Sequence, residues 1–433
     1  MNILMMTNTY LPIVGGLERS IESFTKEYRK RGHRVLIVAP EFKKRPKKEL
    51  DVIRVPAIQN LNGSDFSVNL PIPGFLKVAL GNFKPDLIHV HHPFLLGTTA
   101  LRLAYDYRVP LIYTYHTFFE QTMADLNKGL EVLKRFVVEL STGYANLCDH
   151  VIAPSSSILQ MLQQYGVTTP ITVVPTGIYL KAFEKGSGDQ FRKEVNIPKK
   201  AFVVGHIGRL AVEKNLEFLC QGAATFLKTE KKAYFLIVGN GPLKKKMHQY
   251  LSGLGLKNRT RFAGTVNRKN ISDAFHAMDV FAFSSKSETQ GIVLAEAMAS
   301  GVPVVAVDAP GARDIVRDKF NGRLIPKENS LMFARALSWI LNLNKSGRKK
   351  ISDRAKKTAE EYSMDLCTES ALSLYAKLKA KESQERKSEE SIWSSVMDRI
   401  KAEWDLMSNL TKATKEAITA DNETKILTTR GPS

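Results

Sequence analysis

The chain has 433 residues, of which 43% are hydrophobic and 24% charged, and its formal net charge is +20. This length is enough to bury large cores, and it predicts two domains of ordinary soluble composition. The three cysteines, Cys148, Cys220 and Cys367, are far apart, which argues against a disulfide framework and a zinc site and favours a reduced, cytosolic protein.

The start of the chain and its net charge indicate where the protein is located and which partners it can bind. The start, MNILMMTNTY, lacks the basic lead and long apolar core of a signal peptide, and no later apolar run is long enough to span a bilayer. We therefore expect a cytoplasmic protein. The positive charge favours anionic partners, but no nucleic-acid motif accompanies it, so we expect no nucleic-acid partner.

The chain begins with a pattern typical of an α/β sheet. A short buried strand is expected at 2–7, and a loop at 10–16 leads into a helix over 18–31. Gly15 and Gly16 then lie at the carboxyl end of the strand, where ligands bind in open α/β sheets and glycines allow a phosphate or sugar to approach closely. No G-x-G-x-x-G surrounds the pair, so an ordinary turn is an equal alternative.

A second strand, at 33–39, precedes a basic loop. Such a run is usually a solvated surface, but together with the basic residues of the preceding helix it could also meet acidic lipid. The loop contains Lys43, Lys44, Arg45, Lys47 and Lys48.

Three histidines surround the end of a strand expected at 87–90. His89, His91 and His92 suggest a metal site, but no carboxylate or thiol stands at ligand spacing. Strand alternation also sends His89 and His91 to one face of the sheet and His92 to the other. We therefore expect no metal centre.

The next strand, at 111–115, ends at His116, on the ligand side of the sheet, where a structural role is an equal alternative. An apolar stripe with spacings of four and three residues follows and predicts an amphipathic helix, which serves as core, acceptor groove or membrane-facing surface. The stripe consists of Phe119, Met123, Leu126, Leu130, Leu133, Val137 and Leu140.

A second α/β domain begins with a strand at 201–207 that runs into GRLAVEKN. Arg209 and Lys214 in this string are two cations at a strand end, which can neutralise the charge that develops on a leaving diphosphate. Taken singly, Lys214 is more often a surface lysine. Two further strands end in glycine turns, at Gly239 and Gly241 and at Gly264.

The segment 284–301 is the most informative part of the chain. From Ile292 to Ala299 every residue except Glu296 is apolar or small, so we expect a helix buried almost all round that contains one carboxylate. Gly291, at the helix start, provides a seat for phosphate, and Glu288 lies on the loop before it. The arrangement suits a sugar nucleotide, with Glu288 near the sugar and Glu296 near the ribose. Two surface glutamates on an ordinary helix are the alternative.

The C-terminal part is helical from 331 to 380, and a charged stretch at 381–390 is interpreted as a solvated linker. An apolar stripe with Trp393 and Trp404 then suggests docking on a partner, on the enzyme body or at a membrane interface. The expected divisions are a first domain at 1–180, a polar linker at 181–199, a second domain at 200–358, a helix returning to the first domain at 359–380 and a polar tail at 381–433.

Two strings show a family resemblance. SETQGIVLAEAMASG, from Ser287, resembles the E-x7-E segment of retaining glycosyltransferases of family 4, which have the GT-B fold. TYHTFFEQ, from Thr114, and the ETQG spelling are similar to the diacylglycerol glucosyltransferases of that family. The resemblance covers about residues 1–380 and is more specific for the family than for the acceptor. The sequence departs from the wider family at Gln290, where an aromatic residue is common.

The resemblance implies two facing, Rossmann-like, doubly wound α/β domains, with the donor held mainly by the second domain and the acceptor by the first, and a last helix over 362–378 that crosses back. It implies that His116 contacts the donor sugar, that Glu288 holds it, and that Arg209 and Lys214 bind the diphosphate; these four are the expected catalytic residues. The expected donor-binding residues are Gly15, Gly16, Arg209, Lys214, Gly239, Gly241, Gly264, Gln290, Gly291, Ile292, Val293 and Glu296.

By the same resemblance, we expect retaining transfer of a hexose from UDP-glucose or UDP-galactose to a membrane lipid, diacylglycerol, without a metal or cofactor. The enzyme is expected on the anionic inner face of the cell membrane. The alternatives are another acceptor (a phospholipid, a polyprenyl-linked sugar or a soluble sugar), a soluble phosphorylase or sugar-phosphate synthase, and a noncatalytic sugar-nucleotide-binding protein. The missing G-x-G-x-x-G disfavours a Rossmann dehydrogenase.

Overall fold

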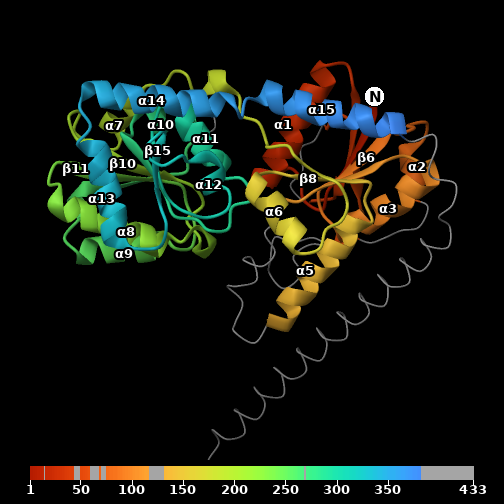
Figure 1. Ribbon diagram of the computed structural model, residues 1–433, viewed down its shortest axis with the longest axis horizontal. Coiled ribbons are helices and arrows are strands. Elements are labelled where there is room, and N and C mark those ends of the chain that lie inside the picture. The colour runs from red at the N-terminus through yellow and green to blue at the C-terminus, as the bar shows by residue number, and fades with distance from the viewer. Residues whose placement is uncertain are drawn as a thin grey trace, which may run out of the picture. The chain divides into compact units, whose positions relative to one another are not determined.

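The computed structural model describes residues 1–13, 15–42, 49–58, 68–69, 75–116, 131–267 and 270–381 (Figure 1). Three predictions lie outside these residues: the basic loop at 43–48, the first four positions of the apolar stripe and the tail with its two tryptophans. The last two stripe positions, Val137 and Leu140, are described and belong to the core.

The first sheet has seven strands in the order β3-β2-β1-β6-β7-β8-β9, and all neighbouring strands are parallel. The order reverses between β1 and β6, as it does in a doubly wound Rossmann fold. The strands are β1 (Asn2–Met6), β2 (Arg34–Pro40), β3 (Val52–Val55), β6 (Leu87–Val90), β7 (Leu111–Thr114), β8 (His150–Ala153) and β9 (Ile171–Val173). A separate antiparallel pair consists of β4 (Ala57–Ile58) and β5 (Val68–Asn69).

The second sheet repeats this topology with six parallel strands in the order β12-β11-β10-β13-β14-β15. Its strand order reverses between β10 and β13. The strands are β10 (Phe202–Ile207), β11 (Ala233–Val238), β12 (Thr260–Gly264), β13 (Val280–Phe283), β14 (Val304–Val307) and β15 (Gly322–Ile325). The two parallel α/β domains confirm the predicted Rossmann-like fold class.

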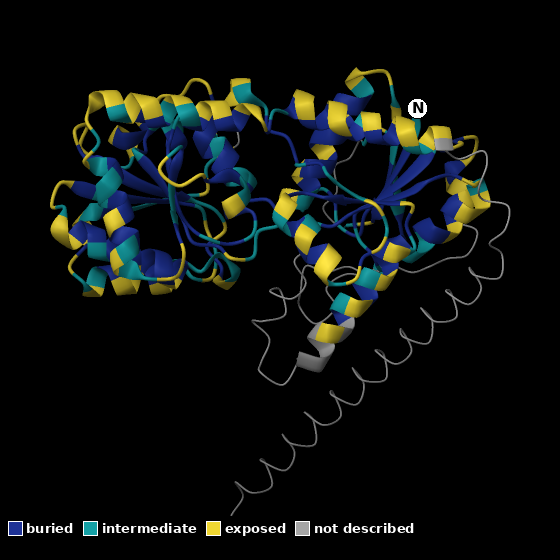
Figure 2. Cartoon of the chain, viewed as in Figure 1, coloured by how far each residue is buried: buried dark blue, intermediate teal, exposed yellow. Residues whose placement is uncertain are grey.

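Helices cover both faces of the second sheet, and they bury one apolar core on each side of it (Figures 1 and 2). The helices of the first domain are α1 (Gly16–Lys30), α2 (Phe75–Leu80), α3 (Leu96–Tyr107), α5 (Glu131–Asn146) and α6 (Ser156–Gln164). Those of the second sheet are α7 (Gly188–Glu194), α8 (Leu216–Thr229), α9 (Lys244–Gly253), α10 (Ile271–His276), α11 (Ile292–Ala299), α12 (Ala312–Ile315), α13 (Ser330–Leu341) and α14 (Lys345–Glu360).

The stretch predicted as a polar linker differs from that prediction. It contains the helix α7, and Phe191 and Ile197 are buried in the core of the second domain. Arg192 is buried as well, and its guanidinium donates to the Asp279 carboxylate at 2.9 Å and to the carbonyl of Ala277. The apolar residues are too widely spaced to form a periodic pattern, and the polar composition of the segment therefore predicted a solvated linker.

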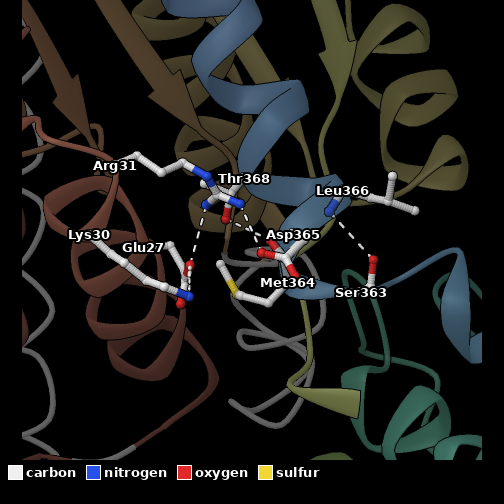
Figure 3. Close-up of polar contacts among 8 residues, drawn as sticks. All are labelled: Glu27, Lys30, Arg31, Ser363, Met364, Asp365, Leu366 and Thr368. Atoms are coloured by element: carbon white, nitrogen blue, oxygen red, sulfur yellow. Dashed lines mark hydrogen bonds and ion pairs between the residues drawn. The ribbon is translucent and has the colours of Figure 1, made fainter. Parts of the chain in front are cut away.

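The last helix, α15 (Met364–Lys381), packs on the first sheet. It lies against α1, where Arg31 pairs with Glu27 of its own helix and with Asp365 of α15, at 3.3 and 2.9 Å (Figure 3). Cys367, Leu374 and Tyr375 of α15 are buried in the same core as the strands β1 and β2. This helix corresponds to the one expected over 362–378.

Candidate active site

Both strand-order reversals have loops with predicted site residues at their carboxyl ends. In the second domain these are the loop after β10, with Arg209 and Lys214, and the loop after β13, with Glu288. In the first domain it is the loop after β1, with Gly15, while His116 follows β7, the second strand beyond the reversal. Open α/β sheets bind ligands at such positions because the adjacent loops diverge there and leave a crevice.

The two loops of the second domain are held together by serine side chains. The hydroxyl of Ser284 donates to the carbonyls of Lys214 and Asn215 at 3.0 Å, and that of Ser287 donates to the carbonyl of Glu213 at 2.8 Å. These bonds fix the backbone on each side of the predicted catalytic groups. Lys214 and Glu288 are thereby brought together and form an ion pair.

The ion pair of Lys214 and Glu288 is three-quarters or more buried, with side-chain exposures of 25% and 20%. Arg209, on the same loop as Lys214, is exposed, and it forms no ion pair with any residue that the structure describes. Among the residues with described positions, the site thus presents one cation without an ion pair, Arg209, and one cation that a carboxylate already neutralises, Lys214.

His206 lies on β10 near this ion pair. Its ring is buried and stacks on Phe281, and Nδ1 lies 3.1 Å from the carbonyl of Ala282, which can only accept, so Nδ1 carries the proton. Burial lowers the pKa of His206 to about 4, so the ring is neutral at pH 7. His206 therefore adds no positive charge to the site.

The helix α11 presents one partly exposed face. Gly291 caps it with a φ of 72°, a left-handed conformation that favours glycine. Leu294, Ala295 and three later residues are buried, but Ile292, Val293 and Glu296 are partly exposed. The expectation of a helix buried all round is therefore wrong for these three positions, which share one face at helical spacing. That face begins in the first turn of the helix and carries the Glu296 carboxylate.

The loop before α11 is bonded to the first domain. Thr289 accepts from the Ser155 hydroxyl at 2.7 Å through its carbonyl, and its hydroxyl donates to the carbonyl of His116 at 3.3 Å. The side-chain amide of Gln290 bonds both backbone groups of Thr176: Oε1 accepts from N–H at 2.7 Å and Nε2 donates to C=O at 2.8 Å. The Gln290 amide is thus engaged within the protein, and only its backbone is left to contact a donor.

His116 belongs to a cluster of histidines. Its Nε2 lies 3.0 Å from Nδ1 of His91, and the ring of His91 lies 4.3 Å from that of His89. Burial is the main reason that the pKa of His116 falls to about 3, and it lowers the pKa of His89 to about 3 as well. These rings are neutral hydrogen-bonding groups at pH 7.

His89 and His92 make hydrogen bonds to neighbouring structural elements, and they lie on opposite faces of the sheet, as strand alternation predicts. His89 bonds the hydroxyls of Thr114 and of Tyr375 from α15, each at 2.6 Å. His92 accepts from the backbone N–H of Asn8 at 3.1 Å. Among the described residues, no group of three or more His, Cys, Asp or Glu side chains could hold a metal ion.

The glycine turns of the second domain lie beside the Arg209 loop. A Cβ on Gly239 would stand 1.9 Å from the carbonyl oxygen of Gly208, and one on Gly241 would stand 2.4 Å from that of Leu210. The N–H of Gly239 donates to the carbonyl of Gly264. These glycines are needed because backbones approach closely here, and their role toward a nucleobase stays a prediction.

Gly15 and Gly16 lie at the start of α1, and the structure adds a group that the sequence did not suggest. The buried carboxylate of Glu18 accepts from the N–H of Gly15 at 2.8 Å. Gly16 is exposed, and a Cβ there would meet nothing within 4 Å. The first turn of α1 therefore already has an anion at its positive end.

Two supporting residues escaped the sequence analysis. Gly311, with a φ of 76°, packs under the loop, where a Cβ would stand 3.0 Å from Cβ and O of Glu288. Asp314 accepts from the N–H groups of Gly311 and Ser157 at 3.1 and 3.0 Å. The string APGARDIV follows β14 directly, and a glycine after a strand end was the available signal.

Comparison with known proteins identifies the class to which this geometry belongs. The family model described as Glycosyltransferase Family 4 matches residues 14–181, and the model described as Glycosyl transferases group 1 matches residues 187–358. The alpha-monoglucosyldiacylglycerol synthase of Streptococcus pneumoniae is 30% identical over 339 residues, which cover 76% of each chain. The chain therefore belongs to glycosyltransferase family 4, and it is a retaining hexosyltransferase.

Two further similar proteins extend the comparison. The GDP-mannose-dependent alpha-mannosyltransferase of Corynebacterium glutamicum is 27% identical over 75% of this chain and 76% of its own. The structure of Anabaena Alr3699/HepE in complex with UDP matches with a TM-score of 0.72 and 22% identity over 87% of this chain and all of that one. This likeness shows the GT-B fold. None of the described helices is both long and apolar enough to cross a membrane.

Proposed function

We propose that the enzyme transfers a hexose from UDP-glucose or UDP-galactose to a membrane lipid, diacylglycerol, with retention of configuration. The observation that carries the transfer is the grouping of Lys214, Glu288 and the partly exposed face of α11, bonded through Thr289 to the backbone of His116. The lipid acceptor is supported by the relative from Streptococcus pneumoniae, whose printed name is that of a glucosyldiacylglycerol synthase.

The residues suggest how the reaction proceeds. The bond between the anomeric carbon and the diphosphate oxygen breaks, and the acceptor hydroxyl oxygen bonds to the anomeric carbon on the same face of the sugar. The proton of this hydroxyl is transferred to the leaving diphosphate. Arg209 and Lys214 offset the charge that develops on the diphosphate, an effect that preorganised cations supply strongly in a water-poor site. Lys214 exchanges its Glu288 partner for phosphate in this step, which frees Glu288 to hold sugar hydroxyls. No resident metal is required in this proposal.

A second candidate is transfer to another acceptor, because a mannosyltransferase is nearly as similar as the glucosyldiacylglycerol synthase. Radiolabelled UDP-glucose, UDP-galactose and GDP-mannose should each be incubated with the enzyme and vesicles with or without diacylglycerol. We expect label from one UDP-sugar to enter the organic phase only when diacylglycerol is present. The same transfer is expected when EDTA is added to remove metal ions. Label on a soluble acceptor alone, or only from GDP-mannose, would overturn the proposal.

A further inference from the structure

The exposed face of α14 is strongly basic, and the proposed reaction makes no use of it. The helix has 16 residues, of which seven are Lys or Arg and two are Asp or Glu. Its buried side packs on α11 through small and apolar residues. Figure 2 shows the exposed residues that run along its outer side. The exposed lysines are Lys345, Lys349, Lys350, Lys356 and Lys357.

These lysines are not neutralised by neighbouring carboxylates. None of the five forms an ion pair with any residue that the structure describes. Elsewhere the cations of helix surfaces are often paired: Arg31 contacts Glu27 and Asp365, and Lys379 of α15 contacts Asp86 at 2.8 Å. A row of unpaired like charges on one helix has an electrostatic cost that an anionic partner would remove.

The lysines follow one stripe rather than the whole circumference. A shallow hollow of about 350 Å³ is lined by Ser346, Lys349, Lys350, Asp353, Arg354 and Lys357. The spacings of three and four residues place these side chains on one side of the helix. The stripe can therefore meet a flat surface along three turns.

The arginines of the helix are used internally. Arg348 donates to the carbonyls of Leu341 and Leu343, and the guanidinium of Arg354 lies 4.6 Å from the ring centre of Phe320. Most of the positive charge that α14 offers to solvent therefore comes from lysine ammonium groups, which act as point charges for phosphates. Single nucleic-acid strands stack on aromatic rings, and adenine is read by Asn or Gln, but α14 contains no aromatic residue and neither of these amides. This favours lipid phosphates over nucleic acid.

We propose that this face of α14 binds the enzyme to anionic lipid headgroups of a bilayer. The choice of a bilayer rests on the proposed lipid acceptor, because an enzyme with such an acceptor must work at a membrane surface. The stripe lies on the second domain, whereas the basic loop at 43–48 that the sequence suggested for the same role is outside the described residues.

The test compares two triple variants that lose the same charge from the same domain. The first is Lys349→Gln, Lys350→Gln, Lys357→Gln on α14. The matched control is Lys228→Gln, Lys231→Gln, Lys232→Gln, which changes three exposed lysines at the end of α8. Binding is measured by flotation with vesicles of phosphatidylglycerol and phosphatidylcholine in equal parts, and with phosphatidylcholine alone.

We expect the wild type to float only with the anionic vesicles and to be released by salt. The α14 variant should bind about a hundredfold more weakly, because each lysine near such a surface contributes about 1 kcal/mol, whereas the control should change by less than about fivefold. Equal weakening of both variants, or wild-type binding that is absent, overturns the inference. So does tighter wild-type binding to a DNA duplex than to anionic vesicles at the same salt concentration.

The failure of this inference can be told apart from the failure of the proposed function. Transfer to diacylglycerol dispersed in detergent does not need the α14 face, so the α14 variant should keep the wild-type rate there. If flotation depends on α14 but neither the wild type nor any variant glycosylates diacylglycerol, the proposed acceptor is wrong, while the inference that α14 binds anionic lipid holds. A rate in detergent that falls as strongly as flotation would show instead that the substitutions damage the enzyme.

Discussion

At the scale of single residues, Lys214 and Glu288 are paired in the protein, although the proposed reaction uses each of them to hold the donor. In a pair of this kind each charge compensates the other until a diphosphate binds. The exchange of partners then requires that the new contacts be at least as favourable as the old one. A dianionic diphosphate satisfies this condition for Lys214, and Arg209, which is exposed, adds to it.

Removing Lys214 should therefore affect the reaction much more than the fold. For Lys214→Ala we expect transfer to fall about a hundredfold, which corresponds to a barrier on the order of 3 kcal/mol higher. Glu296→Ala should mainly raise the donor KM, since Glu296 lies on the partly exposed face of α11. Lys246→Ala is the matched control, because it removes an exposed lysine that also pairs with a glutamate. Near-normal transfer by the folded Lys214 or Glu296 variant would refute the site assignment.

Gln290 shows how one side chain can fix a loop. Its amide makes two bonds of opposite polarity to Thr176, so only an amide satisfies both. In Gln290→Glu the second oxygen faces the Thr176 carbonyl, and leaving such buried groups unpaired costs about 1–3 kcal/mol. We expect kcat to fall at least about tenfold, with UDP affinity changed little. Gln249→Glu, on the exposed side of α9, should leave both unchanged, and equal kinetics of the two variants would contradict a positioning role.

At the scale of elements, the loop before α11 is held from several directions. Serines bond it to the loop after β10, Thr289 and Gln290 bond it to the first domain, and Gly311 supports it from below. The conformation of the Glu288 loop thus depends on bonds between its own side chains and neighbouring elements. A change in any of these elements should reach the catalytic groups.

Gly311→Ala tests this support. The added methyl would stand 2.9–3.0 Å from atoms of Glu288 and Gln290, and alanine is strained at a φ of 76°. We expect transfer to fall by about tenfold or more and the melting temperature to drop by several degrees. Gly253→Ala is the control, because a Cβ there meets nothing within 4 Å. If Gly311→Ala behaved like the control, the loop would not depend on this contact.

At the scale of the whole molecule, buried neutral histidines link stability to pH. His89 and His206 are buried, with pKa values lowered to about 3 and about 4 from 6.5, mainly by burial. Below pH 6.5 the unfolded chain binds protons at these sites and the folded protein does not, so stability is full above that pH and is lost as pH falls.

We expect the free energy of unfolding to decrease between pH 6.5 and 4.5 by up to about 1.4 kcal/mol per pH unit for each of these histidines. Denaturant titrations at several pH values measure the slope. His206→Gln should make it shallower, since the amide does not titrate. A stability that stayed constant or rose as the pH fell through this range would show that these rings do not remain neutral in the folded protein.

Much of the fold follows from local pattern. The long apolar runs, such as 111–115 and 201–207, are continuous because central parallel strands are buried on both faces, so their positions could be predicted within a residue or two. The strands β3 and β15 were missed because each is short and contains an arginine, Arg54 or Arg323, which obscures the apolar run. The helix α7 was missed for a related reason, since its few apolar residues lie in a charged stretch.

The grouping of the candidate site residues was predictable where it depends on local spacing, and not where it depends on distant partners. The order of Glu288, Gly291 and Glu296, and the cations of GRLAVEKN, are fixed by the sequence itself, because a loop and helix of given spacing place these groups at one strand end. Only the tertiary structure decided that Gln290 bonds Thr176, that Gly311 supports Glu288 and that Tyr375 bonds His89. Such contacts join residues up to 286 positions apart, and no local period or propensity encodes which side chains meet when two sheets and a returning helix pack together.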